Sequence, residues 1–243
     1  MGIKMMAMTR GGETYPITDT GRDFHTRHGF ISRKDLDKEG VVKTNTGKEM
    51  FIFKPLFADA YKRIKRHAQI ITPKDLGLII TTTGVNKSSF VVDIGSGSGA
   101  LACFIGVIAK NVVTYDIDDR SIRTTKENAE SLGLKNVKVR KKDATEGIDE
   151  KDADVVTIDM REPWKALDSA IAALKQGGFI AVYSPNITQV IRTIEEAGKK
   201  DGRLAVIRTT ELMQRDWVID EKRARPEFRS LGHTGFLCFM RKV

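Results

Sequence analysis

A short glycine-rich loop is the first feature of this sequence whose residue types and spacing suggest chemistry. Gly95, Gly97 and Gly99 follow the apolar stretch Phe90–Ile94 and precede a helical pattern over Ala100–Ala109. Glycine permits a tight turn and lets the backbone approach a ligand closely. A loop of this kind between a strand and a helix predicts a binding site for a nucleotide or nucleoside.

The spacing of the glycines distinguishes two kinds of nucleoside ligand. A dinucleotide-binding loop would have its third glycine one residue later than Gly99. The spacing favours instead the loop of methyltransferases, over which the carboxypropyl part of S-adenosylmethionine lies. Asp93, just before the loop, could hold the loop amides or, through water, the amino group of that cofactor.

Acidic residues follow the next two apolar stretches and could bind other parts of the cofactor. Asp116 lies 17 residues after Gly99, where a carboxylate can accept hydrogen bonds from both ribose hydroxyls. Binding sites for NAD and for S-adenosylmethionine share this feature, so it indicates a nucleoside without identifying it. Asp143-Ala144 follows the next stretch, where a carboxylate can receive the adenine amino group.

Asp159 is the candidate catalytic residue. It opens the segment Asp159–Trp164, which reads Asp-Met-Arg-Glu-Pro-Trp and follows a fourth apolar stretch. In open α/β sheets ligands bind at the carboxyl ends of strands, near the point where the strand order reverses. We therefore expect Asp159 to face the methyl acceptor. The segment is not the Asn/Asp-Pro-Pro-Tyr motif of methyltransferases that act on exocyclic amines, which suggests another acceptor atom.

These residues need strands and helices that alternate along the chain. The alternation predicts an α/β fold, the Rossmann-like class I methyltransferase sheet, mostly parallel, with helices on both faces and an antiparallel hairpin at its C-terminal edge. Strands are expected at Phe90–Ile94, Val112–Ile117, Val137–Arg140, Val155–Ile158, Gly178–Tyr183, Leu204–Leu212 and Gly235–Arg241, and helices at Pro73–Thr83, Ala100–Ala109, Asp119–Leu132, Pro163–Leu174 and Ile187–Gly198. Thr72 is expected to be the N-cap of the first helix, and Gly84 to end it.

The N-terminal region has a different texture. Short β-prone stretches at Glu13–Ile17, Gly29–Ile31, Val41–Lys43 and Met50–Phe53 alternate with turn signals, and a helical pattern follows over Lys54–Arg66. We therefore predict a small β-rich domain over residues 1–55 and a methyltransferase domain over residues 56–243, in which residues 56–72 form a connecting helix.

Composition limits the compartment and the partners. The 243 residues are 40% hydrophobic and 30% charged, which is typical of a folded globular protein. No apolar run approaches the roughly 20 residues of a membrane span, and the N-terminus lacks a signal-peptide core, which predicts a cytoplasmic protein. The two cysteines and four histidines lack metal-ligand spacing, so no metal is expected. The net charge of +9 favours a polyanionic partner such as nucleic acid, or reflects solubility alone.

Four segments together resemble the TrmI-type tRNA (adenine-N1)-methyltransferases in their archaeal form. They are Arg66–Asp75, Asp93–Leu101, Asp159–Trp164 and the tail, which runs from Arg225-Pro226 to Gly232-His233-Thr234-Gly235-Phe236-Leu237. The stretches Phe24–Ile31 and Lys43–Glu49 are also similar to the small β domain of that family. The glycine loop alone is weak evidence, whereas the residues from Gln69 to Asp75 and the tail are much more specific.

The resemblance implies a homotetrameric enzyme that methylates N1 of T-loop adenines in tRNA, at conventional position 58 and sometimes 57, with S-adenosylmethionine as the methyl donor. The cofactor contacts that it implies are at Gln69, Ser98, Gly99, Ala100, Leu101, Asp116, Asp143 and Asp159. The sequence departs from the family at Asp116, where Glu is usual, and at Met160-Arg161, where Leu-Pro is usual. Thr72 stands where many members have His or an aromatic residue, so stacking on the target base is not expected there.

The resemblance also suggests how the residues act. A carboxylate beside the adenine N6 amino group would orient the base and complement the positive charge that moves onto the ring, and Asp159 is expected to do this without removing a proton. The basic residues that could hold tRNA are Lys62, Arg63, Lys65, Arg66, Lys141, Lys142, Arg223 and Arg225.

Two alternatives stay open. A methyltransferase with a protein or small-molecule acceptor, such as an isoaspartyl carboxylate, would share the loop but would not account for the N-terminal β-rich domain, the basic charge or the tail. A non-catalytic tRNA-binding paralogue would be expected to lose the cofactor loop, which this chain keeps.

Overall fold

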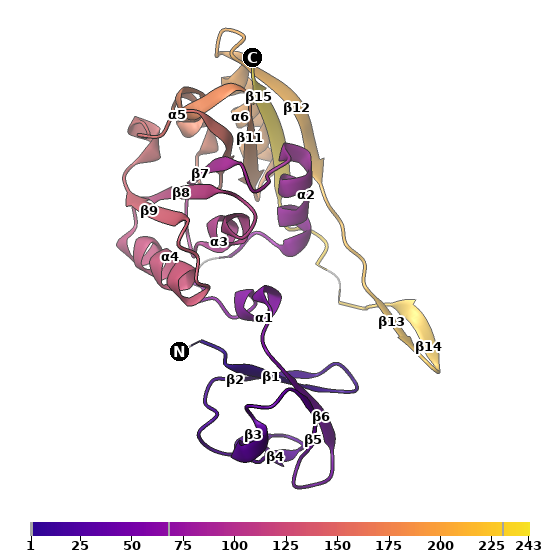
Figure 1. Cartoon of the computed structure of the whole chain (residues 1–243). Helices are drawn as coiled ribbons and strands as arrows, with labels where there is room; N and C mark the ends of the chain where they lie inside the picture. Colours follow the sequence, from indigo (N-terminus) through magenta and orange to yellow (C-terminus); the bar gives the residue numbers. More distant parts are fainter. Residues whose placement is uncertain (1, 68, 230) are drawn as a thin grey trace. The chain divides into compact units, whose positions relative to one another are not determined.

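The computed structural model of the chain describes residues 2–67, 69–229 and 231–243 (Figure 1). It divides into two compact units, one that ends at Ile64 and one that runs from Lys65 to Val243. The first unit extends beyond residue 55, where the sequence placed the boundary, because it includes a short helix. Among the described residues, no helix has the length and apolar character that crossing a membrane requires.

The N-terminal unit contains an antiparallel sheet with the strand order β2-β1-β6-β5. Its strands are β1 (Met5–Thr9), β2 (Thr14–Ile17), β5 (Gly40–Lys43) and β6 (Glu49–Phe53); β3 (Phe24–Thr26) pairs with β4 (Gly29–Ile31), and a 3-10 turn, η1, covers Arg33–Asp35. Ala7, Met50 and Ile52 are buried in its core. The sequence pattern missed β1 because Met-Met-Ala-Met-Thr has only one of the β-branched and aromatic residues that favour strands, Thr9.

The helix predicted over Lys54–Arg66 is much shorter in the structure. Helix α1 covers only Phe57–Tyr61, and the Asp59 carboxylate accepts a hydrogen bond of 2.9 Å from the backbone N–H of Leu56 at its start. Beyond Tyr61 the sequence has basic residues at helical neighbour positions, Lys62 and Arg66 among them. Like charges three or four residues apart oppose continuation of a helix.

The second unit is built on a seven-stranded sheet with the order β12-β15-β11-β10-β7-β8-β9 (Figure 1). The strands are β7 (Phe90–Ile94), β8 (Asn111–Asp116), β9 (Val137–Lys141), β10 (Ala153–Ile158), β11 (Leu174–Ser184), β12 (Leu204–Glu211) and β15 (Phe236–Lys242). The pairs among β7 to β11 are parallel, and β15 is antiparallel to both β11 and β12. The predicted mostly parallel sheet with an antiparallel C-terminal edge is confirmed.

The strand order reverses between β7 and β10. From β7 the chain proceeds through β8 to β9 in one direction, and then from β10 to β11 in the other. Since crossovers between parallel strands are right-handed, the helices that connect the strands of one half lie on one face of the sheet, and those of the other half lie on the opposite face. The helices are α2 (Pro73–Thr83), α3 (Ala100–Gly106), α4 (Asp119–Ser131), α5 (Leu167–Ala173) and α6 (Ile187–Gly198), with 3-10 turns η2 (Ala144–Glu146) and η3 (Pro163–Ala166). The helix predicted over Pro163–Leu174 is thus split into η3 and α5.

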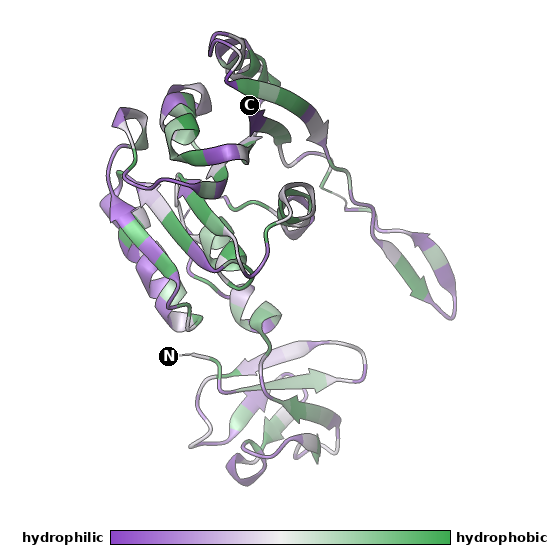
Figure 2. Cartoon of the chain, turned by 45° about the horizontal axis from the view of Figure 1, so that its top comes forward, coloured by the Kyte–Doolittle hydropathy of each residue, from purple (hydrophilic) through white to green (hydrophobic). Residues whose placement is uncertain are grey.

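A hairpin absent from the sequence-based expectation follows β12. It consists of β13 (Trp217–Asp220) and β14 (Arg223–Pro226), which pair antiparallel and extend away from the sheet of the second unit (Figure 1). Figure 2 shows hydrophobic and hydrophilic residues side by side along it. β13 reads Trp-Val-Ile-Asp and favours a strand, whereas β14 has two arginines and a proline. Each strand has only four residues, so the pattern is too short to stand out.

Candidate active site

The carboxyl ends of β7 and β10 border a cavity of about 500 Å³ at the point where the strand order reverses. This is the place where an open α/β sheet binds its ligand. Seven of the twelve predicted cofactor residues line it: Gln69, Gly95, Gly97, Asp116, Asp143, Ala144 and Asp159. The structure thus brings these seven residues together around one cavity, whose size suits a ligand such as a nucleoside.

Two glycines of the loop have different reasons to be glycine. Gly95 has φ +92°, and a Cβ on it would lie 2.0 Å from the carbonyl oxygen of Asp159, so the loop and the end of β10 meet there without room for a side chain. Gly97 has φ +51°, and its Cβ would meet no atom within 4 Å. The open space over Gly97, inside a cavity lined by carboxylates, fits the predicted position of S-adenosylmethionine over the loop.

Asp116 and Asp143 hold their own loops. The Asp116 carboxylate accepts hydrogen bonds from the N–H of Gly97 at 2.9 Å and from the N–H of Asp118 at 3.0 Å. Asp143 accepts from the N–H and the hydroxyl of Thr145, and these bonds lower the pKa of its carboxyl group. Both side chains are thus fixed at the cavity as acceptors for hydroxyl or amino groups. The N-cap of α4 is Asp118, which accepts from the N–H of Ser121.

Asp93 is not among the lining residues of the cavity. Its carboxylate is buried between the neighbouring strands, where it accepts hydrogen bonds of 2.6 Å from the hydroxyls of Thr114 on β8 and Thr157 on β10. Burial raises its pKa to about 6, against the effect of these two hydrogen bonds. The structure thus gives Asp93 a place in the framework that joins three strands at the site.

The residues Ser98, Gly99, Ala100 and Leu101 also lie outside the cavity lining. The hydroxyl of Ser98 accepts a hydrogen bond of 3.1 Å from the N–H of His67. A Cβ on Gly99 would lie 2.7 Å from the Thr125 side chain, so this glycine allows α3 to pack against α4. Ala100 and Leu101 are buried in the first turn of α3.

Asp159 lies directly after β10, at the point where the strand order of the sheet reverses. Among the described residues, none donates a hydrogen bond to its carboxylate, while its backbone N–H donates to the carbonyl of Ile94 at 2.8 Å. Burial, with a further contribution from Asp93, raises the pKa of the Asp159 carboxyl to about 7. The backbone of the residue is therefore fixed, and its carboxylate is available to a ligand.

The sequence reasoning did not assign several other lining residues. They are Ile94, Tyr115, Ile117, Thr145, Met160, Arg161, Glu162 and Lys165; Lys142 also lines the cavity but was predicted only as a basic residue. Ile117 is the most informative, because it is 66% exposed although it is large and apolar. Because Ile117 directly follows Asp116, the sequence could have predicted that it forms an apolar wall of the cavity, against which a flat ring can pack.

A polar cluster joins the start of α2 to the C-terminal tail. Asp75 is fully buried, and its carboxylate accepts hydrogen bonds of 2.8 Å from Thr72, Lys74 and Thr234. Thr72 is the N-cap residue of α2, as predicted, but its side chain makes no capping hydrogen bond to the helix backbone. Its hydroxyl donates to the Asp75 carboxylate instead. Two segments that the sequence singled out separately, 69–75 and 232–237, meet in this cluster.

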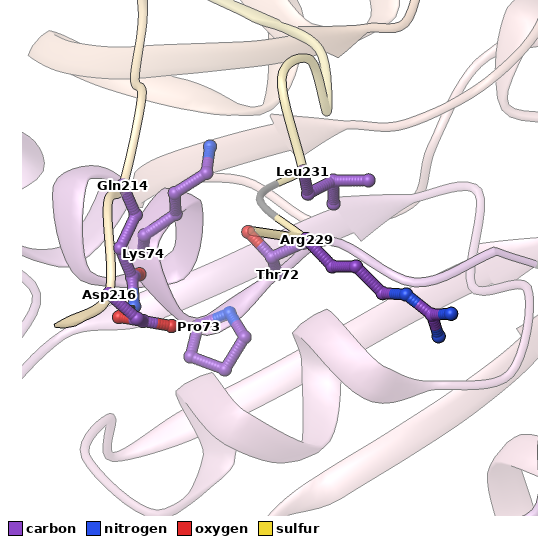
Figure 3. Close-up of a pocket in the computed structure, with 7 residues that line it drawn as sticks. All are labelled: Thr72, Pro73, Lys74, Gln214, Asp216, Arg229 and Leu231. Carbon is purple, nitrogen blue, oxygen red and sulfur yellow. The ribbon is translucent and has the colours of Figure 1, made fainter. Parts of the chain in front are cut away.

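A second cavity, of about 350 Å³, lies beside this cluster. Figure 3 shows its wall at the start of α2, with Gln214 and Asp216 near Pro73 and the guanidinium of Arg229 pointing away from them. Gln214 donates a hydrogen bond of 2.9 Å to the Asp216 carboxylate. Residues after β12 therefore come close to Thr72. Thr72 is only three positions after Gln69, which lines the main cavity.

Several of the basic residues predicted to hold tRNA form ion pairs. Lys65 pairs with Glu127, Lys141 with Asp119, Lys142 with Asp149 and Arg223 with Asp220, at 2.5–2.7 Å. All four are exposed pairs, of a kind that contributes little to stability.

The sheet order, the glycine loop between β7 and α3, and the carboxylates at the strand ends define a class I S-adenosylmethionine-dependent methyltransferase. Within that class, residues 61–229 match the family described as the tRNA methyltransferase complex GCD14 subunit, and the chain belongs to this family.

Three relatives illustrate the likeness. A Methanocaldococcus jannaschii protein named tRNA (adenine(57)-N(1)/adenine(58)-N(1))-methyltransferase TrmI is 32% identical, over 95% of this chain and 92% of its own. The structure of a Thermotoga maritima SAM-dependent O-methyltransferase has a TM-score of 0.88 and 26% identity, and covers 100% of this chain and 93% of its own. That of tRNA (m1A58) methyltransferase TrmI from Aquifex aeolicus has a TM-score of 0.83 and 25% identity, and covers 100% and 99%.

Proposed function

We propose that this protein transfers a methyl group from S-adenosylmethionine to N1 of adenine in the T loop of tRNA, at position 58 and also at 57. The observation that carries the proposal is the free carboxylate of Asp159 at the edge of a cavity otherwise suited to the cofactor. The relative from M. jannaschii, named for methylation of both adenines, and the A. aeolicus structure support the substrate.

The residues of the cavity divide between two tasks. When bound, the cofactor supplies an electrophilic methyl group on a sulfonium. Asp116 binds the ribose hydroxyls, Asp143 with Ala144 binds the adenine end, Gln69 contacts the cofactor from the cavity wall, and the space over Gly97 takes the carboxypropyl part. Asp93 acts indirectly, because it holds the strands that carry the loop and Asp159.

Asp159 is proposed to position the target base. Adenine N1 has its own lone pair, so the reaction needs orientation more than it needs a base. An ionised carboxylate that accepts a hydrogen bond from the N6 amino group fixes the ring and stabilises the positive charge that develops on it. A target adenine has to leave its stacked position to reach this group.

Assembly and compartment follow from the same proposal. We infer that the enzyme is a homotetramer in the cytoplasm, where its tRNA substrate is processed, with a β-rich N-terminal domain and a catalytic domain that the chain enters near residues 56–72.

Labelled cofactor tests the proposal. Incubation with an unmodified tRNA transcript should place the label in RNA, and a transcript with guanosine at 57 and 58 should take up little. Label only in protein would overturn the substrate. Calorimetry that detects no cofactor binding would indicate a non-catalytic paralogue.

A further inference from the structure

A basic surface adjoins the catalytic cavity on the side of α6. It forms a hollow of about 390 Å³ that is lined by Arg161, Glu162, Trp164, Asn186, Gln189 and Arg192. Arg161 and Glu162 also line the catalytic cavity, so the two spaces adjoin at the segment that follows Asp159. A ligand held in this hollow would lie next to whatever occupies the catalytic cavity.

Two arginines in this hollow have no acidic partner. Neither the guanidinium of Arg161 nor that of Arg192 forms an ion pair or hydrogen bond with any residue that the structure describes, and both residues are exposed. The carboxylate of Glu162 is paired with Lys165 at 2.5 Å, and that of Glu196 with Lys199 at 2.8 Å. These two carboxylates thus have lysine partners of their own, so the two arginines add positive charge to the hollow.

The side chain of Arg192 and the backbone of Arg161 are also held in place. The Cζ atom of Arg192 lies 4.2 Å from the centroid of the Trp164 ring, a cation–π arrangement that orders its side chain. Gln189 donates a hydrogen bond of 2.8 Å to the carbonyl of Arg161 and accepts one of 3.2 Å from the N–H of Asn186. The Gln189 amide therefore fixes the backbone of Arg161 to the start of α6, and binding there would order few additional groups.

We propose that Arg161 and Arg192 bind the phosphodiester backbone of the RNA substrate next to the nucleotide in the catalytic cavity, with Trp164 as the support of Arg192. The inference rests on the proposed function, which supplies an RNA. Guanidinium groups match the geometry of phosphate oxygens, and contacts of this kind set the register of a nucleic acid on a protein. Here they would position the nucleotide that Asp159 orients.

The test measures binding of an unmodified tRNA transcript, in the presence of S-adenosylhomocysteine, as a function of salt concentration. Arg192→Gln should weaken binding about 5–20-fold near 0.1 M salt and reduce the slope of log K against log salt by about 0.7–0.9, the loss expected for one phosphate contact. Lys151→Gln is the matched control, because Lys151 is exposed, carries the same charge and lies before β10, at the strand end opposite Asp159. It should change binding less than twofold.

Further variants separate charge from packing. Arg192→Lys keeps the charge but loses the planar stacking on Trp164, and it should retain the salt slope. Arg161→Gln should add to the effect of Arg192→Gln, and calorimetry with S-adenosylhomocysteine should give a cofactor affinity for Arg192→Gln within twofold of the unaltered chain. Melting temperatures show that each variant is folded.

The outcomes are distinct from those of the proposed function. If the unaltered protein binds tRNA and Arg192→Gln keeps its affinity and salt slope, like Lys151→Gln, the inference is wrong although the function stands. If the unaltered protein does not bind or methylate tRNA, the proposed function fails first, which is seen without any variant.

Discussion

At the scale of single residues, burial decides the state of the two aspartates at the end of β7 and β10. Asp93 receives two hydroxyl hydrogen bonds, and Asp159 receives none from the described residues. Both carboxyl pKa values are raised by burial, that of Asp159 to about 7. Asp159 thus changes its charge near neutral pH, in the range where the proposed reaction needs it ionised.

The first prediction concerns the pH dependence of turnover. With a saturating tRNA transcript, the rate of methyl transfer should rise roughly tenfold per pH unit below about 7 and level off above it, because only the ionised Asp159 complements the developing charge. Asp159→Asn should lower the rate on the order of 100-fold or more and remove this pH dependence. A variant that turns over at near-normal rate would remove Asp159 from the mechanism.

Asp159→Asn should lower the rate but increase stability above about pH 7, where the buried carboxylate of the unaltered protein is charged. The folded-state pKa of Asp159 is raised above the ordinary value of 3.8, so the protonated form is favoured by folding. Its contribution to the free energy of unfolding is present below about pH 4 and is lost as the pH rises through about 7. Urea denaturation of Asp159→Asn should show a smaller decline over this range, and an identical decline in both proteins would contradict the raised pKa.

Gly95 and Gly97 provide a matched pair of variants. Gly95→Ala would place a Cβ 2.0 Å from the Asp159 carbonyl oxygen, and should cost more than about 3 kcal/mol of stability. Gly97→Ala meets no atom, so it should cost only about 1–2 kcal/mol for the left-handed backbone. Gly97→Ala should nevertheless weaken cofactor binding at least tenfold by calorimetry. Equal losses of stability in the two variants would contradict these two roles.

At the scale of elements, local sequence signals were sufficient where they agreed with each other. Phe90–Ile94 and Ile187–Gly198 are found as predicted, and Pro73–Thr83 begins with proline and ends at Gly84 in the left-handed conformation. β1 and the hairpin β13–β14 were not predicted, because the first is rich in methionine and the strands of the second have only four residues each. Local pattern also cannot reveal that β1 pairs with the distant β6.

The convergence of the candidate site residues was predictable to a similar degree. Strand ends predicted that Asp116, Asp143 and Asp159 lie around one cavity, because parallel strands bring their carboxyl ends to one edge. The position of Asp93 depends on hydroxyls of two other strands, and no local pattern announces them. In the same way, the role of Thr72 was set by Asp75 and not by the helix backbone.

The junction between α2 and the tail gives a prediction for these elements. Asp75→Ala would leave the ammonium of Lys74, whose side chain is 13% exposed, without its carboxylate, and should cost about 3–5 kcal/mol in urea denaturation. Asp119→Ala removes the exposed pair with Lys141 and should cost less than about 1 kcal/mol. Similar costs for both variants would mean that the buried cluster does not hold the tail.

At the scale of the whole molecule, the fold and the net charge concern the two reactants of the proposed reaction, the cofactor and the tRNA. The methyltransferase sheet provides a cofactor cavity, and the net charge of +9 provides attraction for a polyanion. Charge alone left nucleic acid and solubility equally open, and it was the pairing of this charge with the Asp159 site and the family that favoured tRNA.

The most direct measurement of this account is nucleoside analysis of an unmodified tRNA transcript after incubation with the protein and labelled S-adenosylmethionine. The account predicts that the label is found in N1-methyladenosine, from the T-loop adenines, and that Asp159→Ala binds the cofactor but forms little of it. Label in a different nucleoside, or label only in protein, would contradict the account.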